Sequence, residues 1–246
     1  MSESINIKTL SNILFVDIET AGSSKNFMGL PPEGKNLWCQ RAKLIRRRND
    51  EYRLIPDEEL YLLKAGIFAE FARVVCISVA FLKKTEEENC VQLKTKSFFA
   101  HDESQLIKEF FSLLVRSFGT RDIEFLCGHN IREFDIPFLC RRARIHGIDI
   151  PACIDFTAKK AWQVKNLIDT MELWKFGDYK NYSSLALLCY ATGIPSPKQG
   201  FDGAAVHIAY WNGARLSEII SYCEADVKAT ARLFLKLSGH YKLKTI

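Results

Sequence analysis

The stretch Asn12-Ile-Leu-Phe-Val-Asp-Ile-Glu-Thr20 predicts a buried strand that carries two acids near its end. Its first half is apolar and prone to form β-structure, and a loop rich in glycine and proline follows it. Asp17 and Glu19 are two residues apart, so on a strand both side chains point to the same face. Paired carboxylates supply the oxygen ligands that Mg²⁺ prefers. The stretch therefore indicates half of a divalent-metal site.

The same spacing of acids occurs twice more, which shows that it can arise by chance. Asp57/Glu59 opens an expected helix, where acids complement the helix dipole, and Asp122/Glu124 precedes a strand. Only Asp17/Glu19 ends a buried strand. The context favours this pair.

Around this strand the chain predicts an α/β fold with a mixed sheet of about five to six strands flanked by helices. Further strands are expected at 73–81, 90–99, 123–127 and 167–169, and the first two of these form an antiparallel hairpin. Helices are expected from about 101–104 to 115, and over 131–145, 183–192 and 216–237. The first helix is expected to bury one face, made of Leu106, Ile107, Phe110, Phe111, Leu114 and Val115.

A basic helical insertion at about 31–66 interrupts what we expect to be a single domain spanning 1–246. One helix is expected within 35–53, and a second begins at Pro56. Residues 35–53 hold seven basic and two acidic side chains, a net charge of +5. Because the whole chain has 34 basic and 29 acidic residues, the remainder has 27 of each and is neutral. The insertion predicts a nucleic-acid-binding patch at Arg46, Arg47 and Arg48, with a solvated helix face as the alternative.

Composition narrows the class of protein. The longest strongly apolar stretch, 74–82, is nine residues, far below the roughly 20 that span a bilayer. The N-terminus lacks the pattern of a secretory signal, so a cytoplasmic location is expected. The eight cysteines are widely spaced and form no Cys-x-x-Cys pair, which favours reduced, buried thiols over a disulfide framework or a zinc site.

Two further groups of residues carry chemistry. Asn130 and Asp135 lie where the strand at 123–127 leads into a helix; alone, they would be a cap and a partner of the helix dipole. Tyr222 and Asp226 are four apart on a helix and share a face. The alternative for this pair is an amphipathic helix with an exposed acid and a half-buried tyrosine.

Together, Asp17-Ile-Glu19, Asn130-x-x-x-Phe-Asp135 and Tyr222-x-x-x-Asp226 resemble the three motifs of the DEDD superfamily of 3′–5′ exonucleases, in its tyrosine branch (DEDDy). The likeness is greatest to the proofreading exonuclease domain of B-family DNA polymerases. It spans most of residues 13–237, and the region 35–59 departs from it.

The resemblance implies a ribonuclease H-like fold in which Asp17, Glu19, Asp135 and Asp226 hold two Mg²⁺ or Mn²⁺ ions that clamp the scissile phosphate. It also implies that Tyr222 orients the attacking water or helps to deprotonate it. A phenol with an ordinary pKa near 10 is a poor base at neutral pH, so orientation is the expected role.

Four other residues have expected roles near this site. Thr20, Asn130 and Phe134 are candidates for contact with the terminal nucleotide, although each could instead cap or pack. His129 is expected to be structural, because Tyr222 takes the position of the base. The sequence identifies no partner for His207.

The expected function is a metal-dependent 3′–5′ exonuclease that acts on single-stranded DNA in repair, proofreading or nucleic-acid turnover. An RNA substrate is the alternative within the enzyme class, since the same site chemistry suits either sugar. A non-catalytic nucleic-acid-binding module of the same fold is the alternative from another class. A proofreading subunit that works with a separate polymerase is a third.

Overall fold

The strand that opens the sequence lies inside the sheet of the molecule. The computed structural model describes residues 10–87, 90–120, 123–178, 182–196, 203–213, 215–240 and 244–245. Within these residues, β1 (Ile13–Gly22) belongs to a six-stranded sheet of order β5-β4-β1-β2-β3-β6. The other strands are β2 (Ala72–Lys84), β3 (Cys90–Phe99), β4 (Phe125–Gly128), β5 (Leu167–Asp169) and β6 (Lys244–Thr245).

The pairing of the strands is mixed, as the sequence predicts. β1 pairs with β2, and β2 with β3, in antiparallel fashion. β4 lies parallel to β1, β5 parallel to β4, and β6 parallel to β3. The fold is the α/β, ribonuclease H-like class that was expected, with the predicted hairpin at β2 and β3.

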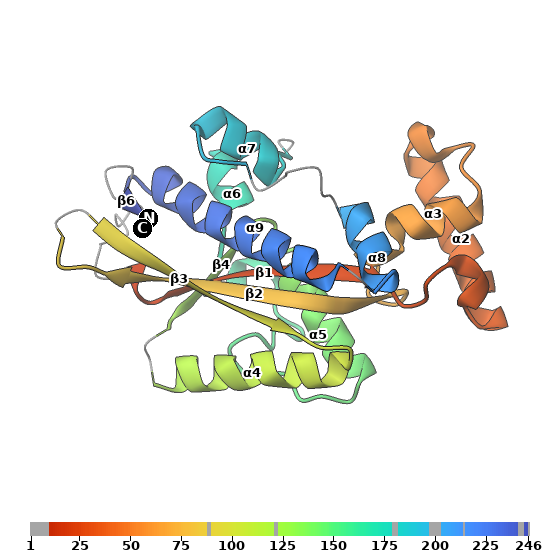
Figure 1. The fold of residues 1–246 in the computed structure, drawn as a ribbon, viewed down its shortest axis with the longest axis horizontal. Helices are drawn as coiled ribbons and strands as arrows, with labels where there is room; N and C mark the ends of the chain where they lie inside the picture. Colours follow the sequence, from red (N-terminus) through yellow and green to blue (C-terminus); the bar gives the residue numbers. More distant parts are fainter. Residues whose placement is uncertain are drawn as a thin grey trace.

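The side chains of β1 contribute to two layers of the core, because successive side chains of a strand point to opposite faces of the sheet. Leu14, Val16 and Ile18 pack with residues of α4 (Glu103–Gly119) and α5 (Asp135–Ile145). Ile13 and Phe15 pack with α9 (Leu216–Leu237). Figure 1 shows α4 and α5 on one side of the sheet and α9 on the other.

The other helices are α2 (Pro32–Arg48), α3 (Asp57–Lys64), α6 (Thr170–Lys175), α7 (Leu185–Thr192) and α8 (Gly203–Trp211). α9 has the predicted bounds, and α7 ends, as predicted, at Thr192, before Gly193, whose φ is +67°. Two helices, α6 and α8, were not predicted. In the described part of the chain, no helix combines the length and the apolar character needed to cross a bilayer.

Two predicted features of the helices are wrong. Val115 was placed on the buried face of α4, but it is 59% exposed. At about 100° per residue, Val115 points about 110° away from the middle of the buried stripe, beyond its edge. The helix expected to begin at Ile131 begins at Asp135, because Asn130 has a left-handed φ of +65° and the chain turns before the helix starts.

The insertion predicted at 31–66 connects β1 to β2 and has a small core of its own. The helix expected within 35–53 spans residues 32–48 and is followed by a 3₁₀ turn, and α3 begins after Pro56, as predicted. Trp38 is fully buried, its ring lies 5.2 Å from those of Tyr61 and Phe71, and its indole donates to the Asp57 carbonyl at 2.9 Å. Figure 1 shows this unit at one end of the sheet, beside α8.

Candidate active site

The acids of β1 lie on the face of the sheet that α9 covers. Asp17 is opposite Ser78 and Glu19 is opposite Cys76 on β2. The register of the two strands shifts directly after Glu19, as in a β-bulge, a feature that often re-aims side chains beside active sites. Asp17, Glu19 and Cys223 of α9 can each offer a ligand atom within 4.8 Å of those of the other two.

Cys223 lies between the third and fourth acids in the sequence and was not singled out from it. Its thiol donates to the backbone oxygen and to Oδ2 of Asp17, each at 3.5 Å. Burial and the neighbouring groups raise the pKa of this thiol well above its ordinary value, so it remains neutral. A neutral, soft thiol is a poor ligand for Mg²⁺. Its contact therefore positions Asp17.

Asp135 comes to the same place from α5. It is 3% exposed, and its Oδ1 accepts the backbone N–H of Ile18 at 3.2 Å, between the two acids of β1. Burial raises the pKa of Asp135 to about 7, with further increases from Asp169 and Asp226 and an opposing effect of the backbone hydrogen bonds. Asp135 thus closes the site from the side opposite α9.

The four predicted acids act on one another electrostatically. The pKa of Asp17 lies well above its ordinary value, chiefly because of burial and then because of Asp226, Glu19 and Asp135. Carboxylates crowded in this way repel one another unless protons or cations neutralise them. The structure thus brings together all four acids, which come from β1, α5 and α9. Hard oxygen donors in this arrangement fit Mg²⁺ or Mn²⁺.

Tyr222 belongs to the same cluster. Burial raises the pKa of its phenol far above the ordinary value, and the carboxylates of Asp226, Glu19 and Asp17 add to the increase. The phenol is therefore protonated at neutral pH and can donate a hydrogen bond. It cannot take up a proton as a base.

The loop of the second motif is held by Asp169, which sequence reasoning missed. This residue ends β5, is 4% exposed, and accepts the backbone N–H groups of Asn130 at 2.9 Å and Arg132 at 3.2 Å. The Asn130 side chain donates to the Tyr182 hydroxyl at 3.3 Å, and Asn130 does not cap the helix. The available signal was an acid at the end of a predicted strand.

His129 is engaged through both ring nitrogens. Nδ1 lies 2.9 Å from the Thr170 hydroxyl, and Nε2 lies 2.9 Å from the Ser183 carbonyl, to which it donates. Burial lowers the pKa of this imidazole, so its neutral form is favoured. In this arrangement neither nitrogen is available to activate water.

A cleft of about 470 Å³ opens beside Glu19, and Thr20 and Phe134 line it. The Thr20 hydroxyl donates to the Gly66 carbonyl at 2.7 Å, which ties β1 to the insertion. Phe134 is half-buried, and its ring packs against that of Phe138 with centroids 5.4 Å apart. Both residues thus have structural contacts and also face the cleft.

His207 lines the same cleft and has the partners that its sequence context did not reveal. Its Nδ1 accepts the backbone N–H of Gly22 at 3.0 Å, so its Nε2 donates to the Lys25 carbonyl, also at 3.0 Å. Its ring lies edge-on to Tyr61 of the insertion at 6.2 Å. His207 therefore fastens the end of β1 to the base of the insertion.

The predicted group of three arginines is not one surface. Arg46 donates to the Ile55 carbonyl at 2.7 and 3.0 Å and to Asp57 Oδ1 at 2.5 Å. Asp57 neutralises its charge inside the insertion, which argues against the expected role as a phosphate contact. Arg47 and Arg48 are exposed, and Arg48 lines a cleft.

Comparison with known proteins gives a family and a fold. Residues 67–242 match the family described as a predicted 3′–5′ exonuclease related to the exonuclease domain of PolB. This region includes Asp135, Tyr222 and Asp226, whereas β1 precedes it. The family B DNA polymerase from the hyperthermophilic archaeon Pyrobaculum calidifontis has a similar structure, with a TM-score of 0.53 and 16% identity. The match covers 91% of this chain but only 24% of the polymerase. No curated protein matches the sequence.

Proposed function

Because this chain belongs to the family of predicted 3′–5′ exonucleases related to the exonuclease domain of PolB, we propose that it removes nucleotides from the 3′ end of single-stranded DNA in a metal-dependent reaction. One observation carries the proposal: Asp17, Glu19, Asp135 and Asp226 form a single electrostatic cluster, with Tyr222 beside it. This set supports the proposal that the chain belongs to the tyrosine branch of the DEDD superfamily.

The four acids would hold two divalent cations. When bound, such ions supply positive charge and Lewis acidity to a phosphodiester. The donor set supports this assignment, because it consists of buried and half-buried carboxylates, and the pKa values of Asp17 and Asp135 are raised by burial first and then by the neighbouring carboxylates. Ile18 N–H and the Cys223 thiol fix two of these carboxylates before any ion arrives.

The remaining residues of the site would position the substrate. Tyr222, protonated, donates a hydrogen bond that orients the attacking water. The cleft beside Glu19 would receive the terminal nucleotide, with Phe134 on one wall and the backbone of Thr20 nearby. DNA is the proposed substrate because the similar solved structure is that of a DNA polymerase.

The cysteines support a reducing location such as the cytoplasm. All eight are free thiols, and five of them are buried. Buried thiols without disulfides are typical of proteins in reducing compartments.

The first prediction tests the site directly. Single-stranded DNA and RNA of one sequence, labelled at the 5′ end, are incubated with Mg²⁺ or Mn²⁺. The DNA should shorten into a ladder, and Asp17→Asn should slow this by at least about 10³-fold, because metal-held charge contributes several kcal/mol at the transition state. EDTA should stop the reaction.

Glu59→Gln is the matched control, because Glu59 belongs to another Asp-x-Glu pair and is exposed. It should leave the rate within about twofold, as expected for a surface substitution. Cleavage of RNA without cleavage of DNA would mean that the substrate is RNA. Cleavage that survives Asp17→Asn or EDTA would refute the site, and binding without any cleavage would favour the non-catalytic module.

A further inference from the structure

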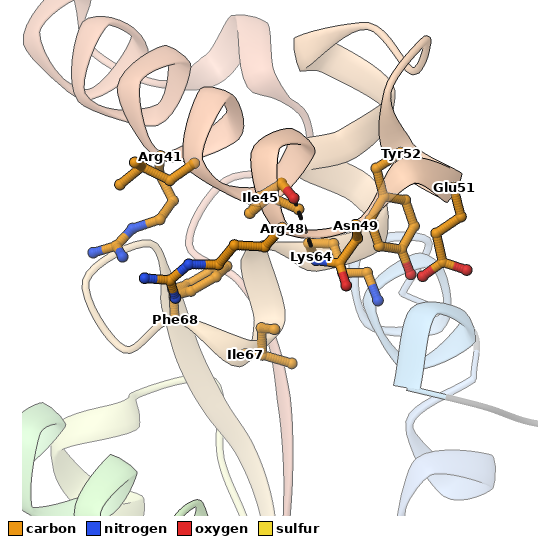
Figure 2. A pocket seen from close by; sticks show the side chains of 10 residues that line it. Arg41, Ile45, Arg48, Asn49, Glu51, Tyr52, Lys64, Ile67 and Phe68 are labelled. Atoms are coloured by element: carbon orange, nitrogen blue, oxygen red, sulfur yellow. Dashed lines mark hydrogen bonds between the residues drawn. The ribbon is translucent and has the colours of Figure 1, made fainter.

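The insertion contains a second cleft, of about 260 Å³, between the last turns of α2 and the segment that follows α3. Arg41 and Arg48 of α2 lie on it, together with Tyr52, Lys64 and Phe68. Figure 2 shows the guanidinium groups of Arg41 and Arg48 reaching out on the side of Phe68. On the other side, Lys64 lies close to Tyr52.

This cleft adjoins the one beside the candidate active site. Tyr52, Lys64 and Ile67 line both of them, and the cleft beside the candidate active site also has Glu19 and Thr20 in its wall. Ile67 is 53% exposed and forms an apolar step where the two meet. A chain that leaves the candidate active site on this side passes directly into the insertion.

The charge of the second cleft is available to a ligand. Arg41, Arg48 and Lys64 give three positive charges against one acid, Glu51, a net of +2. Among the described residues, no ion pair involves any of the three basic side chains. Arg46 lies on the same helix, three residues after Lys43. In contrast to the basic residues of the cleft, it forms an ion pair with Asp57 that neutralises its charge.

Aromatic rings accompany the basic groups. The Arg41 guanidinium lies 5.0 Å from the ring centre of Phe68, and the Lys64 ammonium lies 4.6 Å from that of Tyr52. Cation–π contacts of this kind hold a charged group in place without cancelling its charge. Basic groups that follow a backbone, beside rings on which bases stack, are the recurring features of sites for single-stranded nucleic acid.

We propose that this cleft is a second nucleotide subsite, which binds the phosphates and one base of the substrate strand on the 5′ side of its terminal nucleotide. Arg41, Arg48 and Lys64 contact phosphates, and a base stacks on Tyr52. The proposal rests on the proposed exonuclease function for the direction of the strand. Arg41, Arg48, Tyr52 and Lys64 precede residue 67, where the family match begins, so the subsite is a feature of the insertion.

The test measures binding and turnover separately. Affinity for a fluorescent 12-nucleotide single strand is measured by anisotropy in EDTA, over a series of salt concentrations. Arg41→Ala/Arg48→Ala should weaken binding about tenfold and reduce the slope of log K against log salt by about 1.4, or about 0.7 for each lost phosphate contact on a single strand. Lys43→Ala/Arg47→Ala is the matched control, because both residues are exposed on α2 outside the cleft; it should stay within about twofold of wild type.

Stacking is tested at Tyr52. Tyr52→Phe keeps the ring and should bind as wild type, whereas Tyr52→Ala should lose about fivefold in affinity or more, the range for one stacked base. Circular dichroism confirms that each variant is folded. Equal losses in the cleft variant and the control variant, or no loss in either, would overturn the subsite.

Turnover distinguishes the two proposals. With Mg²⁺, Arg41→Ala/Arg48→Ala should raise KM for the 12-mer about tenfold, in line with its loss of affinity. Its kcat/KM for the dinucleotide dTpT should equal that of wild type. If wild type cleaves neither substrate, the proposed function fails and the binding data alone decide the subsite. If cleavage of the dinucleotide falls as much as that of the 12-mer, the subsite is wrong and the function stands.

Discussion

Tyr222 shows how the surroundings of one residue decide its chemistry. The sequence predicts its presence beside Asp226, and its ordinary pKa near 10 already argues against a role as base. Burial and three nearby carboxylates raise the pKa further above neutral pH. The hydroxyl can therefore donate a hydrogen bond across the whole pH range of an assay.

Tyr222→Phe tests this conclusion. Loss of one positioned donor should lower kcat about 10²-fold, the usual range for such groups. Because the phenol does not titrate between pH 6 and 9, the variant and wild type should have pH–rate profiles of the same shape, at different heights. The measurement is kcat against pH on the 5′-labelled strand.

Tyr190→Phe is the control, because Tyr190 is 85% exposed, and it should be unchanged. Mg²⁺ should stabilise Tyr222→Phe as much as wild type in thermal unfolding. A limb of the wild-type profile that disappears in Tyr222→Phe would show that the phenol ionises and acts as a base.

Single residues also show where sequence reasoning ends. Asp17 and Glu19 were predictable because a buried strand leads into them. The three adjacent residues Arg46, Arg47 and Arg48 are of the same type. Nothing in the local sequence therefore distinguishes the one whose charge is neutralised by an ion pair. That difference comes from Asp57 and the Ile55 carbonyl, about ten residues further along the chain.

At the scale of elements, local patterns predicted the long amphipathic helices well, but they missed α6 and α8 and the turn that precedes α5. The bounds of α9 agree because its amphipathic pattern runs over its whole length. The start of α5 was wrong because Asp169, some 40 residues later, holds the backbone of Asn130 and Arg132 in a turn. A hydrogen bond across that distance leaves no periodic signal in the sequence.

The insertion is an element-scale unit with its own core. Its buried side chains centre on Trp38, Tyr61 and Phe71. Hydrogen bonds of Thr20 and Ser24, together with the His207 contact, fasten its base to β1 and α8. A unit held in this way can open locally while the sheet stays folded.

Trp38→Ala tests this independence. Truncation of a fully buried tryptophan should cost about 3–5 kcal/mol, most of it within the insertion. Trypsin should then cut within residues 35–53 at least about tenfold faster than in wild type, while the rest of the chain stays resistant. The sites of the first cuts are identified by mass spectrometry.

Leu44→Ala is the control on the same helix, because Leu44 is 44% exposed, and it should leave the rate of cutting nearly unchanged. Early cuts in Trp38→Ala spread over β2, α4 and α9 would show that the insertion and the sheet unfold together. The insertion would then not be a separate unit.

At the scale of the molecule, the site joins distant parts of the chain. Asp17, Asp135 and Asp226 come from β1, α5 and α9, and each would contribute to one metal centre. The sequence predicts the α/β class and each motif by itself. We expected the motifs to meet only because of the resemblance to a known family. The periodicity of a sequence does not predict which helix end faces which strand.

This arrangement makes stability depend on metal and pH together. In the metal-free protein the pKa of Asp135 is about 7, above the value near 3.9 of an unfolded chain. The folded state then binds more protons than the unfolded state between about pH 4 and 7, so this contribution to stability is present at low pH and is lost as pH rises through 7. Bound cations would restore it at high pH.

Asp135→Asn keeps an oxygen that can accept the Ile18 N–H but removes the charge. In EDTA at pH 8 its Tm should exceed that of wild type by on the order of 5 °C, and the difference should shrink at pH 5.

His129 and His207, whose pKa values are lowered by burial, destabilise both proteins equally as pH falls, so their effect cancels in the comparison. Addition of 10 mM Mg²⁺ at pH 8 should raise the Tm of wild type more than that of the variant, because a ligand that binds more tightly at the same concentration stabilises the folded state more. Asp149→Asn, at an exposed acid, should follow wild type throughout. A variant less stable than wild type at pH 8 in EDTA would mean that Asp135 stabilises the empty site, and that its carboxylate is not held there against repulsion.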